Sequence, residues 1–97
     1  MQQVLIDAIN DRQVLCFYHE NLLREVEPFA YGINSKGKEV LRGFQVAGQS
    51  TSGRIPCWRV FEAEKMQRLY LAGRQFDGAR PDYRPDDNDL TTVFAQL

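Results

Sequence analysis

Short runs rich in β-branched and aromatic residues recur roughly every dozen residues through most of this chain, and polar turns separate them. Each run predicts one strand, because branched and aromatic side chains pack well on a pleated, half-buried surface. The runs lie at 14–19, 23–33, 38–48, 56–62 and 66–72, and the last would also suit a two-turn helix. Five closely spaced strands favour a small, strongly bent barrel over a parallel sheet.

The beginning of the chain differs from this strand-rich body. Four apolar residues within the first ten lie on one helical stripe: Val4, Leu5, Ala8 and Ile9. This spacing predicts one short amphipathic helix. A helix followed by five short strands predicts a mainly β domain over residues 1–76, with the topology of an SH3-like or Sm-like barrel.

The C-terminal segment, residues 77–97, changes character. It is rich in Gly, Pro and Asp, which predicts an extended arm. Its end has apolar residues at i, i+3, i+4 and i+7, with Asp89 as a possible N-cap. These apolar residues are Leu90, Val93, Phe94 and Leu97. The spacing predicts that the arm ends in a short docking helix.

Two residues interrupt the regular strand pattern. Pro28 lies inside the run 23–33 and has no N–H to donate, so its strand is expected to be an edge, or to be bent or bulged there. Gly43 lies inside the run 38–48 and predicts a bulge or sharp coiling. We therefore expect an irregular rather than a flat sheet.

The charge balance excludes a strongly basic protein. Twelve Lys and Arg against 13 Asp and Glu give a net charge of −1, so no global field draws the chain to nucleic acid or to an anionic membrane. No apolar run approaches the ~20 residues needed to span a bilayer, and no signal peptide is evident. We expect a soluble cytoplasmic protein without a membrane partner, in which any cationic site is local.

Residue types that carry metal binding or catalysis are sparse. Cys16 and Cys57 form no CxxC pair, and His19 is the one imidazole, so a zinc site lacks ligands. In a reducing cytoplasm both thiols are expected in the core rather than in a disulfide. The acidic run 86–89 lacks the spacing of a calcium loop. No catalytic triad or phosphate-cradling glycine motif is evident, so we expect no metal, no cofactor and no enzymatic activity.

An arginine interrupts the apolar face of two predicted strands. In the stretch CWRVF, Arg59 stands between Cys57 and Phe61 at the period-2 spacing of one strand face. In VLRGFQV, Arg42 interrupts an apolar face in the same way. A desolvated arginine without a partner costs on the order of several kcal/mol. Arginines in such positions therefore indicate a site where an anionic ligand supplies the opposite charge.

The order and spacing of several short motifs resemble the WYL domain family. That family's pattern has an arginine two residues before a valine and four before a proline, then a strand bearing Trp-Tyr-Leu, an Arg-x-Phe strand and a hydrophobic last strand. The corresponding residues here are Arg24, Val26 and Pro28, then Val40 and Leu41, then Arg59 and Phe61, then Met66, Leu69 and Phe76. The resemblance covers about residues 5–76. Glu39 and Val40 stand where the family has Trp and Tyr, and Leu41 is retained.

The resemblance implies an Sm-like SH3 barrel with an N-terminal helix. WYL domains usually follow a winged-helix DNA-binding domain in bacterial transcription regulators, where they sense ligands, and some bind single-stranded nucleic acid or nucleotides. Ninety-seven residues leave no room for that winged helix. We therefore expect a stand-alone bacterial or phage module that acts through a regulator partner protein, by self-association, or by binding its ligand alone.

The arginines define a candidate site. Arg24, Arg42 and Arg59 fall on three strands that a barrel brings side by side, and Arg54 lies in the loop before the last of them. The planar guanidinium donates bidentate hydrogen bonds to phosphate and stays charged at every relevant pH. Nearby residues that could stack on a base or hydrogen-bond to it are Tyr18, Phe44, Gln45 and Ser50. We expect a groove that binds a nucleotide or single-stranded nucleic acid.

Two alternatives stay open from the sequence. The arginines could pair with Glu25, Glu27 and Glu39 on neighbouring strands and merely cover the surface. The chain could also be a protein-interaction or oligomerisation module that uses its tail helix or an exposed strand edge, without a ligand of its own.

Five further residues carry expectations of their own. His19 is expected to face solvent or to bond within its hairpin, with a phosphate contact as the alternative. Trp58 is expected in the core or at an interface. Phe76, Arg80 and Tyr83 are expected to pack the arm against the barrel, and Arg80 or Tyr83 could reach the edge of the site.

Overall fold

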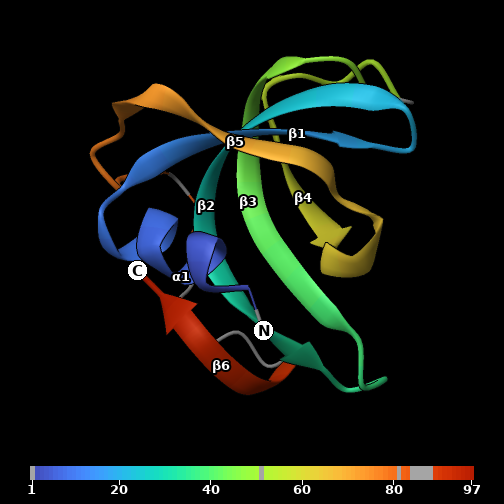
Figure 1. Ribbon diagram of the computed structural model, residues 1–97, viewed down its shortest axis with the longest axis vertical. Helices are drawn as coiled ribbons and strands as arrows, with labels where there is room; N and C mark the ends of the chain where they lie inside the picture. Colours follow the sequence, from blue (N-terminus) through green and yellow to red (C-terminus); the bar gives the residue numbers. More distant parts are fainter. Residues whose placement is uncertain (1, 51, 81, 84–88) are drawn as a thin grey trace.

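The protein is mainly β with one α-helix, as predicted (Figure 1). The computed structural model describes residues 2–50, 52–80, 82–83 and 89–97. The elements are α1 (Gln3–Asn10), β1 (Gln13–His19), β2 (Leu22–Asn34), β3 (Glu39–Gly48), β4 (Cys57–Glu62), the 3₁₀ turn η1 (Ala63–Lys65), β5 (Gln67–Gln75) and β6 (Leu90–Gln96). All five predicted runs are strands, and the run at 66–72 is β5 rather than a helix.

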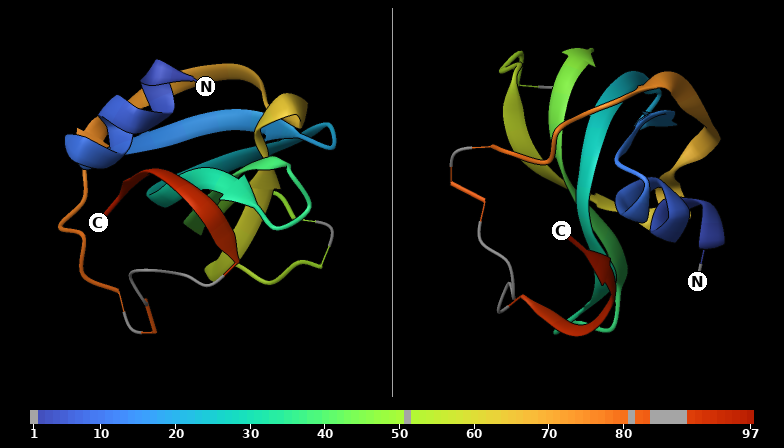
Figure 2. Two further views of the ribbon diagram at one scale, coloured as in Figure 1. Left: turned by 90° about the horizontal axis from the view of Figure 1, so that it is seen from below. Right: turned by 90° about the vertical axis from the view of Figure 1, so that its left-hand side faces the viewer.

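The strands of the described residues form one antiparallel sheet in the order β4-β3-β2-β1-β5. β2 is the strand that joins the whole sheet. One of its edges pairs with β3, while the other pairs with β1 at Leu22–Val26 and with β6 at Ala30–Asn34. The sheet curls strongly, so that β1 and β5 cross over β2 and β3 (Figures 1 and 2). β4 and β5 are not paired with each other, and the sheet is therefore not closed.

The predicted C-terminal helix is wrong, because residues 90–96 form β6 and raise the described strands from five to six. The helical spacing of four apolar residues also allows a strand over so short a length. Backbone pairing with β2 decides between the two, and Thr91 Oγ1 adds a hydrogen bond of 3.1 Å to the carbonyl oxygen of Ile33. Asp89 does not cap a helix, and its carboxylate instead lies 3.3 Å from Arg42 Nη2.

Pro28 lies in the central strand and not at a sheet edge, so that part of its prediction is wrong. The predicted bulge is confirmed, because the register between β2 and β3 shifts between Pro28 and Ala30. Gly43 pairs with Pro28 at this irregularity. A Cβ on Gly43 would overlap the side chain of Val26 and lie 2.9 Å from the carbonyl oxygen of Glu27. A glycine is therefore required where the two strands come closest.

The hydrophobic core lies on the inner face of the curled sheet, which is the face toward α1. The helix contacts β1, β2 and β6 and buries three residues of its predicted apolar stripe, Leu5, Ala8 and Ile9, whereas Val4 is 38% exposed. The sheet contributes Leu15, Phe17, Val26, Tyr31, Leu41, Phe61 and Ala95 to the same cluster. Phe17 and Phe61 meet edge to face with ring centroids 5.0 Å apart.

The outer face of the sheet is covered by the arm, described at residues 76–80 and 82–83. The ring of Tyr83 stacks on Trp58, with centroids 5.7 Å apart, and its hydroxyl donates to the carbonyl oxygen of Leu97 at 2.8 Å. Arg80 makes a bidentate pair with Glu27 at 2.8 and 2.9 Å and lies over the ring of Phe44. The predicted packing of the arm is thus confirmed. Residues 86–88 of the acidic run lie outside the described residues.

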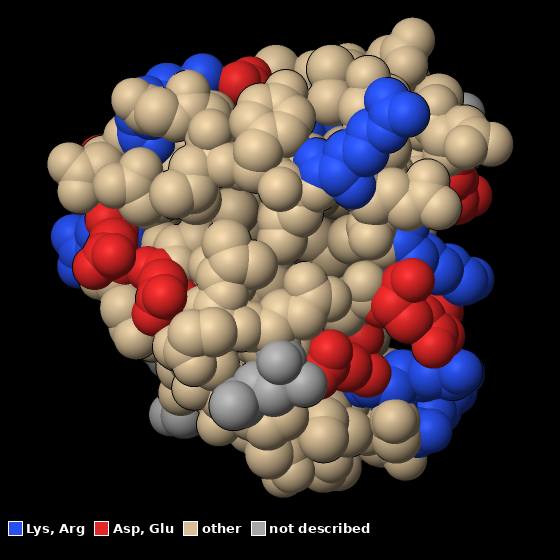
Figure 3. All heavy atoms as spheres, viewed as in Figure 1, with Lys and Arg blue, Asp and Glu red and all other residues tan. Residues whose placement is uncertain are grey.

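Charged side chains of both signs gather around the rim of the face in Figure 3, with an uncharged centre. This agrees with the net charge of −1. Both cysteines are free thiols. In the part of the chain that the structure describes, no helix has the length and apolarity needed to cross a membrane.

Candidate functional site

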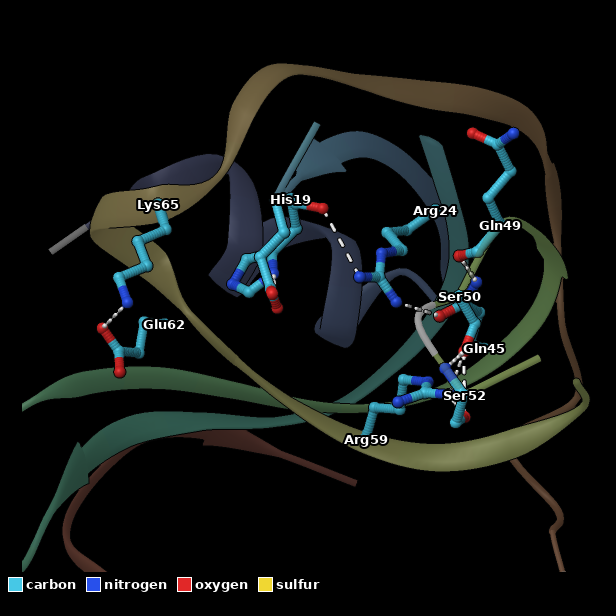
Figure 4. A network of polar contacts seen from close by, with 10 residues as sticks. His19, Arg24, Gln45, Gln49, Ser50, Ser52, Arg59, Glu62 and Lys65 are labelled. Atoms are coloured by element: carbon cyan, nitrogen blue, oxygen red, sulfur yellow. Dashed lines mark hydrogen bonds and ion pairs between the residues drawn. The ribbon is translucent and has the colours of Figure 1, made fainter. Parts of the chain in front are cut away.

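A pocket of about 160 Å³ opens at the end of the inner face, beside the β1–β2 turn. We call it the arginine pocket, because it contains the guanidinium groups of two of the predicted arginines (Figure 4). Its lining residues are His19, Glu20, Arg24, Trp58, Arg59, Val60 and Phe61.

Arg24 projects from β2 into the inner face and is only 2% exposed. Its Nη1 donates to Gln45 Oε1 at 3.2 Å, and its Nη2 donates to the carbonyl oxygen of His19 at 3.4 Å. Both acceptors are neutral, and no carboxylate of the described residues lies within ion-pair distance of this guanidinium. Burial lowers the pKa of Arg24 below its ordinary value, and repulsion from Arg59 lowers it further. The carboxylate of Glu20, which is largely exposed on the rim of the pocket, acts in the opposite direction. The fold thus holds a desolvated positive charge without an ion pair.

Gln45 on β3 is the residue that orients Arg24. It is fully buried, and its Nε2 donates to the carbonyl oxygens of Ala47 at 3.1 Å and Gln49 at 2.9 Å. These two bonds fix the amide so that Oε1 faces Arg24. They also fix the chain as it leaves β3, and the loop that follows carries Ser50.

Arg59 projects from β4 into the same face, as its spacing with Cys57 and Phe61 predicts. Its Nη2 donates to the hydroxyls of Ser50 and Ser52, the latter at 2.7 Å, and more weakly to the carbonyl oxygen of Arg54 at 3.5 Å. All these acceptors are again neutral. The loop before β4 therefore positions the guanidinium without neutralising it.

Unpaired polar atoms are concentrated at the arginine pocket. Among the described residues, four buried side-chain nitrogen atoms have no hydrogen-bond partner: Nδ1 and Nε2 of His19, Nε of Arg24 and Nε of Arg59. All three residues line this one pocket. An unpaired buried polar atom costs about 1 to 3 kcal/mol, and native proteins contain few of them. Among the described residues, the destabilisation caused by unpaired buried side-chain nitrogens is therefore confined to this pocket.

His19 lines the arginine pocket, although the sequence interpretation gave it a phosphate contact only as the alternative. The β1–β2 hairpin turns through Glu20 and Asn21, both with positive φ, as a two-residue turn requires. This tight turn leaves His19 facing inward, 8% exposed and edge to face with Phe61 at 5.2 Å. The expected solvent-facing histidine is wrong. Its period-2 spacing after Phe17 could have indicated the inner face.

Arg42 does not join the arginine pocket. In the β3–β4 register Arg42 pairs with Val60 and Gly43 pairs with Arg59, so the two arginines lie on opposite faces of the sheet. Arg42 forms an ion pair with Asp89. The prediction that all three arginines line one pocket is therefore wrong, although Arg42 and Arg59 share a neighbouring hollow at the β4 edge.

Tyr18 and Phe44 are also wrong as pocket residues. Tyr18 faces a different hollow, beside Arg68 at a distance of 5.9 Å from the guanidinium carbon to the ring centre. Phe44 lies on the outer face against Trp58, with centroids 5.3 Å apart. Arg54 contributes its carbonyl oxygen rather than a described side-chain contact. Gln45 and Ser50 lie where the sequence predicts them, and Ser52 is an addition.

Glu25 and Glu27, two of the three strand carboxylates considered as partners of the site arginines, pair with other residues. Glu25 pairs with Arg74 at 2.8 Å and Glu27 pairs with Arg80, so both carboxylates bind arginines outside the pocket. Hydrogen bonding to Arg74 lowers the pKa of Glu25 below its usual range.

The donor set of the pocket suits an anion and not a cation. Arginine cannot ligate a metal, since it offers only N–H donors. Within the ranges described, no group of three or more His, Cys, Asp and Glu side chains could hold a metal ion. A comparison of the chain with protein-family models, with curated proteins and with solved structures finds no match.

Proposed function

We propose that this chain is a WYL-like regulatory or sensor module that binds an anionic ligand, a nucleotide or single-stranded nucleic acid, in the arginine pocket. The observation that carries the proposal is the convergence of every described unpaired buried side-chain nitrogen on this one pocket. An oxyanion would accept hydrogen bonds from these nitrogens and neutralise the two arginines. The curled sheet with its N-terminal helix supports a relation to the Sm-like SH3 barrel.

A purely structural role would leave both arginines poorly explained. An exposed ion pair contributes only about 0 to 1 kcal/mol, whereas a buried charge without a partner is strongly unfavourable. Arg24 is buried beside a like charge, and its hydrogen-bond acceptors are neutral, while the carboxylate of Glu20 acts on it only from the rim of the pocket. Such an arrangement is retained where the binding of a counter-charge offsets its cost.

The size of the pocket limits what can enter it. Pockets for drug-sized ligands usually measure about 300 to 1,000 Å³, so a volume of about 160 Å³ suits one phosphate group rather than a whole nucleotide. A second hollow of about 210 Å³ shares Trp58, Arg59 and Val60 with it and adds Arg42. Val60 is 53% exposed at this junction. The sugar and base would lie there, over the β4 edge.

We propose further that the module acts in the cytoplasm of a bacterium, in transcription regulation. The two free thiols support a reducing compartment. Its effect would reach other molecules through a regulator partner protein or through a second copy.

The decisive experiment measures binding of labelled nucleoside phosphates and short oligonucleotides over a salt series. Arg59→Gln removes one pocket charge, while Arg68→Gln removes an exposed arginine beside Tyr18 and serves as the matched control. We expect binding by the wild type and the control, and at least tenfold weaker binding by Arg59→Gln. Equal binding by all three proteins, or none by any of them, would refute the proposal.

A second candidate function rests on β5. It is an end strand of the sheet, and its Tyr70 and Leu71 are 51% and 48% exposed. An unpaired edge with apolar side chains favours pairing with another chain. We infer, as the alternative, an interaction module that uses this edge without a ligand. Light scattering of the wild type and Leu71→Lys tests it, since a monomer at every concentration contradicts self-association.

A further inference from the structure

His19 is placed to take part in anion binding as a titrating group. Its ring lies in the arginine pocket with both nitrogens buried and free of hydrogen bonds. Nδ1 lies 3.4 Å from Glu20 Oε1, but the geometry is not that of a hydrogen bond. The imidazole is thus held by packing against Phe61 rather than by a polar partner.

Charged groups of both signs surround this ring. The β1–β2 turn contributes Glu20, which is largely exposed on the rim of the pocket. β2 contributes Arg24, and β4 contributes Arg59 to the pocket. Glu62 and Lys65 lie beyond the ring and pair with each other at 3.4 Å. The two pocket arginines are thus the charges that share the buried space with His19.

Burial lowers the pKa of His19 below its ordinary value of about 6.5. Glu20 and Glu62 act in the opposite direction, and Arg24 and Lys65 lower the pKa further. In the empty pocket the ring is therefore neutral near pH 7.

We propose that the arginine pocket takes a dianionic tetrahedral end group, such as a phosphate monoester or sulfate, and that it binds this group together with a proton on His19. This inference rests on the proposed function and names the class of group that enters the pocket. Arg24, Arg59 and His19 come from three different strands and each has an unpaired nitrogen. Three terminal oxygens of a phosphate monoester match three donors, whereas an internal phosphodiester has only two unbridged oxygens.

Proton uptake follows from the charges. A dianion between the two arginines offsets their repulsion of an imidazolium and supplies an acceptor for its N–H. The pKa of His19 is therefore higher in the complex than in the empty pocket. Linkage then makes binding strongest at a pH below the pKa of the empty state, and binding weakens as pH rises through the pKa of the complex. For each unit by which the ligand raises the pKa of His19, the ligand binds tenfold more tightly at low pH than at high pH.

The test uses the fact that the chain contains a single histidine. NMR titration of its ring from pH 5 to 8, with sulfate or with chloride at equal ionic strength, gives the pKa of His19 in each state. Sulfate is the probe because it does not titrate in this range, whereas a phosphate monoester has a pKa near 6. Sulfate affinity is measured over the same range, also for His19→Gln and Arg59→Gln, with Arg68→Gln as the control.

We expect sulfate to raise the pKa of His19 in the wild type and in Arg68→Gln, but not in Arg59→Gln. Sulfate affinity should increase at least threefold from pH 8 to pH 5.5, and this dependence should be absent in His19→Gln. Sulfate binding without a change in the pKa of His19 would overturn the inference and leave the proposed function intact. The absence of binding of sulfate and of every nucleotide would overturn both.

A second comparison tests the end group. A nucleoside 5′-monophosphate should bind at least tenfold more tightly than a dinucleotide that has only an internal phosphodiester. Equal affinity for the two would contradict a dianionic end group, while binding of either would still support the proposed function.

Discussion

Arg24 on β2 and Arg59 on β4 lie close enough for their positive charges to repel each other, although β3 separates the two strands. Gln45 of that middle strand binds Arg24, while Ser50 and Ser52 of the following loop bind Arg59. The contacts orient both guanidinium groups and neutralise neither.

Arg24→Met should remove anion binding without lowering stability. The substitution keeps an aliphatic chain of similar length and eliminates a buried charge without a carboxylate partner. The lost hydrogen bond to Gln45 costs about 1 kcal/mol, and relief from charge burial offsets it. Measured by urea unfolding, the free energy of unfolding of the variant should equal that of the wild type or exceed it by up to about 2 kcal/mol. Sulfate should stabilise the wild type more than this variant.

A contrary outcome for Arg24→Met is easy to recognise. A loss of more than about 2 kcal/mol, with unchanged sulfate binding, would show that Arg24 serves the fold alone. The difference between the proteins is the informative quantity, because sulfate also stabilises folded proteins in general.

The bidentate pair of Arg80 and Glu27 should contribute measurable coupling energy to the docked arm. The side chain of Glu27 is 10% exposed, and both its oxygens accept hydrogen bonds. A double-mutant cycle with both glutamine variants should give about 1 to 2 kcal/mol. Lys38 and Glu64 form a control pair at 3.5 Å with both side chains more than half exposed. Their coupling should stay below about 0.5 kcal/mol, and equal values for the two pairs would contradict tight docking of the arm.

Gly32→Ala should detach β6 from the sheet. A Cβ at Gly32 would overlap the carbonyl oxygen of Thr92, because the two strands approach closely there. We expect a loss of more than about 2 kcal/mol in unfolding free energy and faster amide exchange in β6. Gly37→Ala is the control, since its turn is open and only the positive φ opposes a side chain, at a cost of about 1 kcal/mol. Equal losses in the two variants would argue against the β2–β6 pairing.

Tyr31 should make the protein sensitive to alkali. Burial raises the pKa of Tyr31 from 10 to about 12. The unfolded chain therefore releases this proton first, and stability falls as pH rises from about 10 through the folded-state value of about 12. Between pH 9 and pH 11.5 the loss should be about 2 kcal/mol, measured by urea unfolding at these two pH values. Tyr31→Phe should show a smaller decrease over this interval, and an equal decrease would place the cause elsewhere.

Alternation along single strands accounts for what the sequence predicts correctly. The period-2 position of Arg59 places it on the same strand face as Cys57 and Phe61. Ser50 follows from its place in the loop after β3. Gln45 lies in the site as expected, but on the opposite face of β3 from Phe44, which the sequence predicts beside it. Local patterns of this kind also give α1 and the first five strands.

The errors arise where distant segments decide the outcome. Arg42 and Arg59 each interrupt an apolar face in the sequence, but the register of β3 with β4 determines which face is inner, and a shift of one residue would exchange them. In the same way, β6 exists because an edge of β2 remains unpaired beyond β1. His19 shares a pocket with Arg24 and Arg59 only because the sheet curls.

Trp58 is the only tryptophan of the chain, and it precedes Arg59 on β4. Successive residues of a strand point to opposite faces, so the indole packs with Tyr83 under the arm while the neighbouring guanidinium faces the pocket. The chain therefore carries its own fluorescent reporter, which packs against the arm and also lines the arginine pocket and the neighbouring hollow. Its emission should respond both to the packing of the arm and to a ligand that enters from the β4 edge.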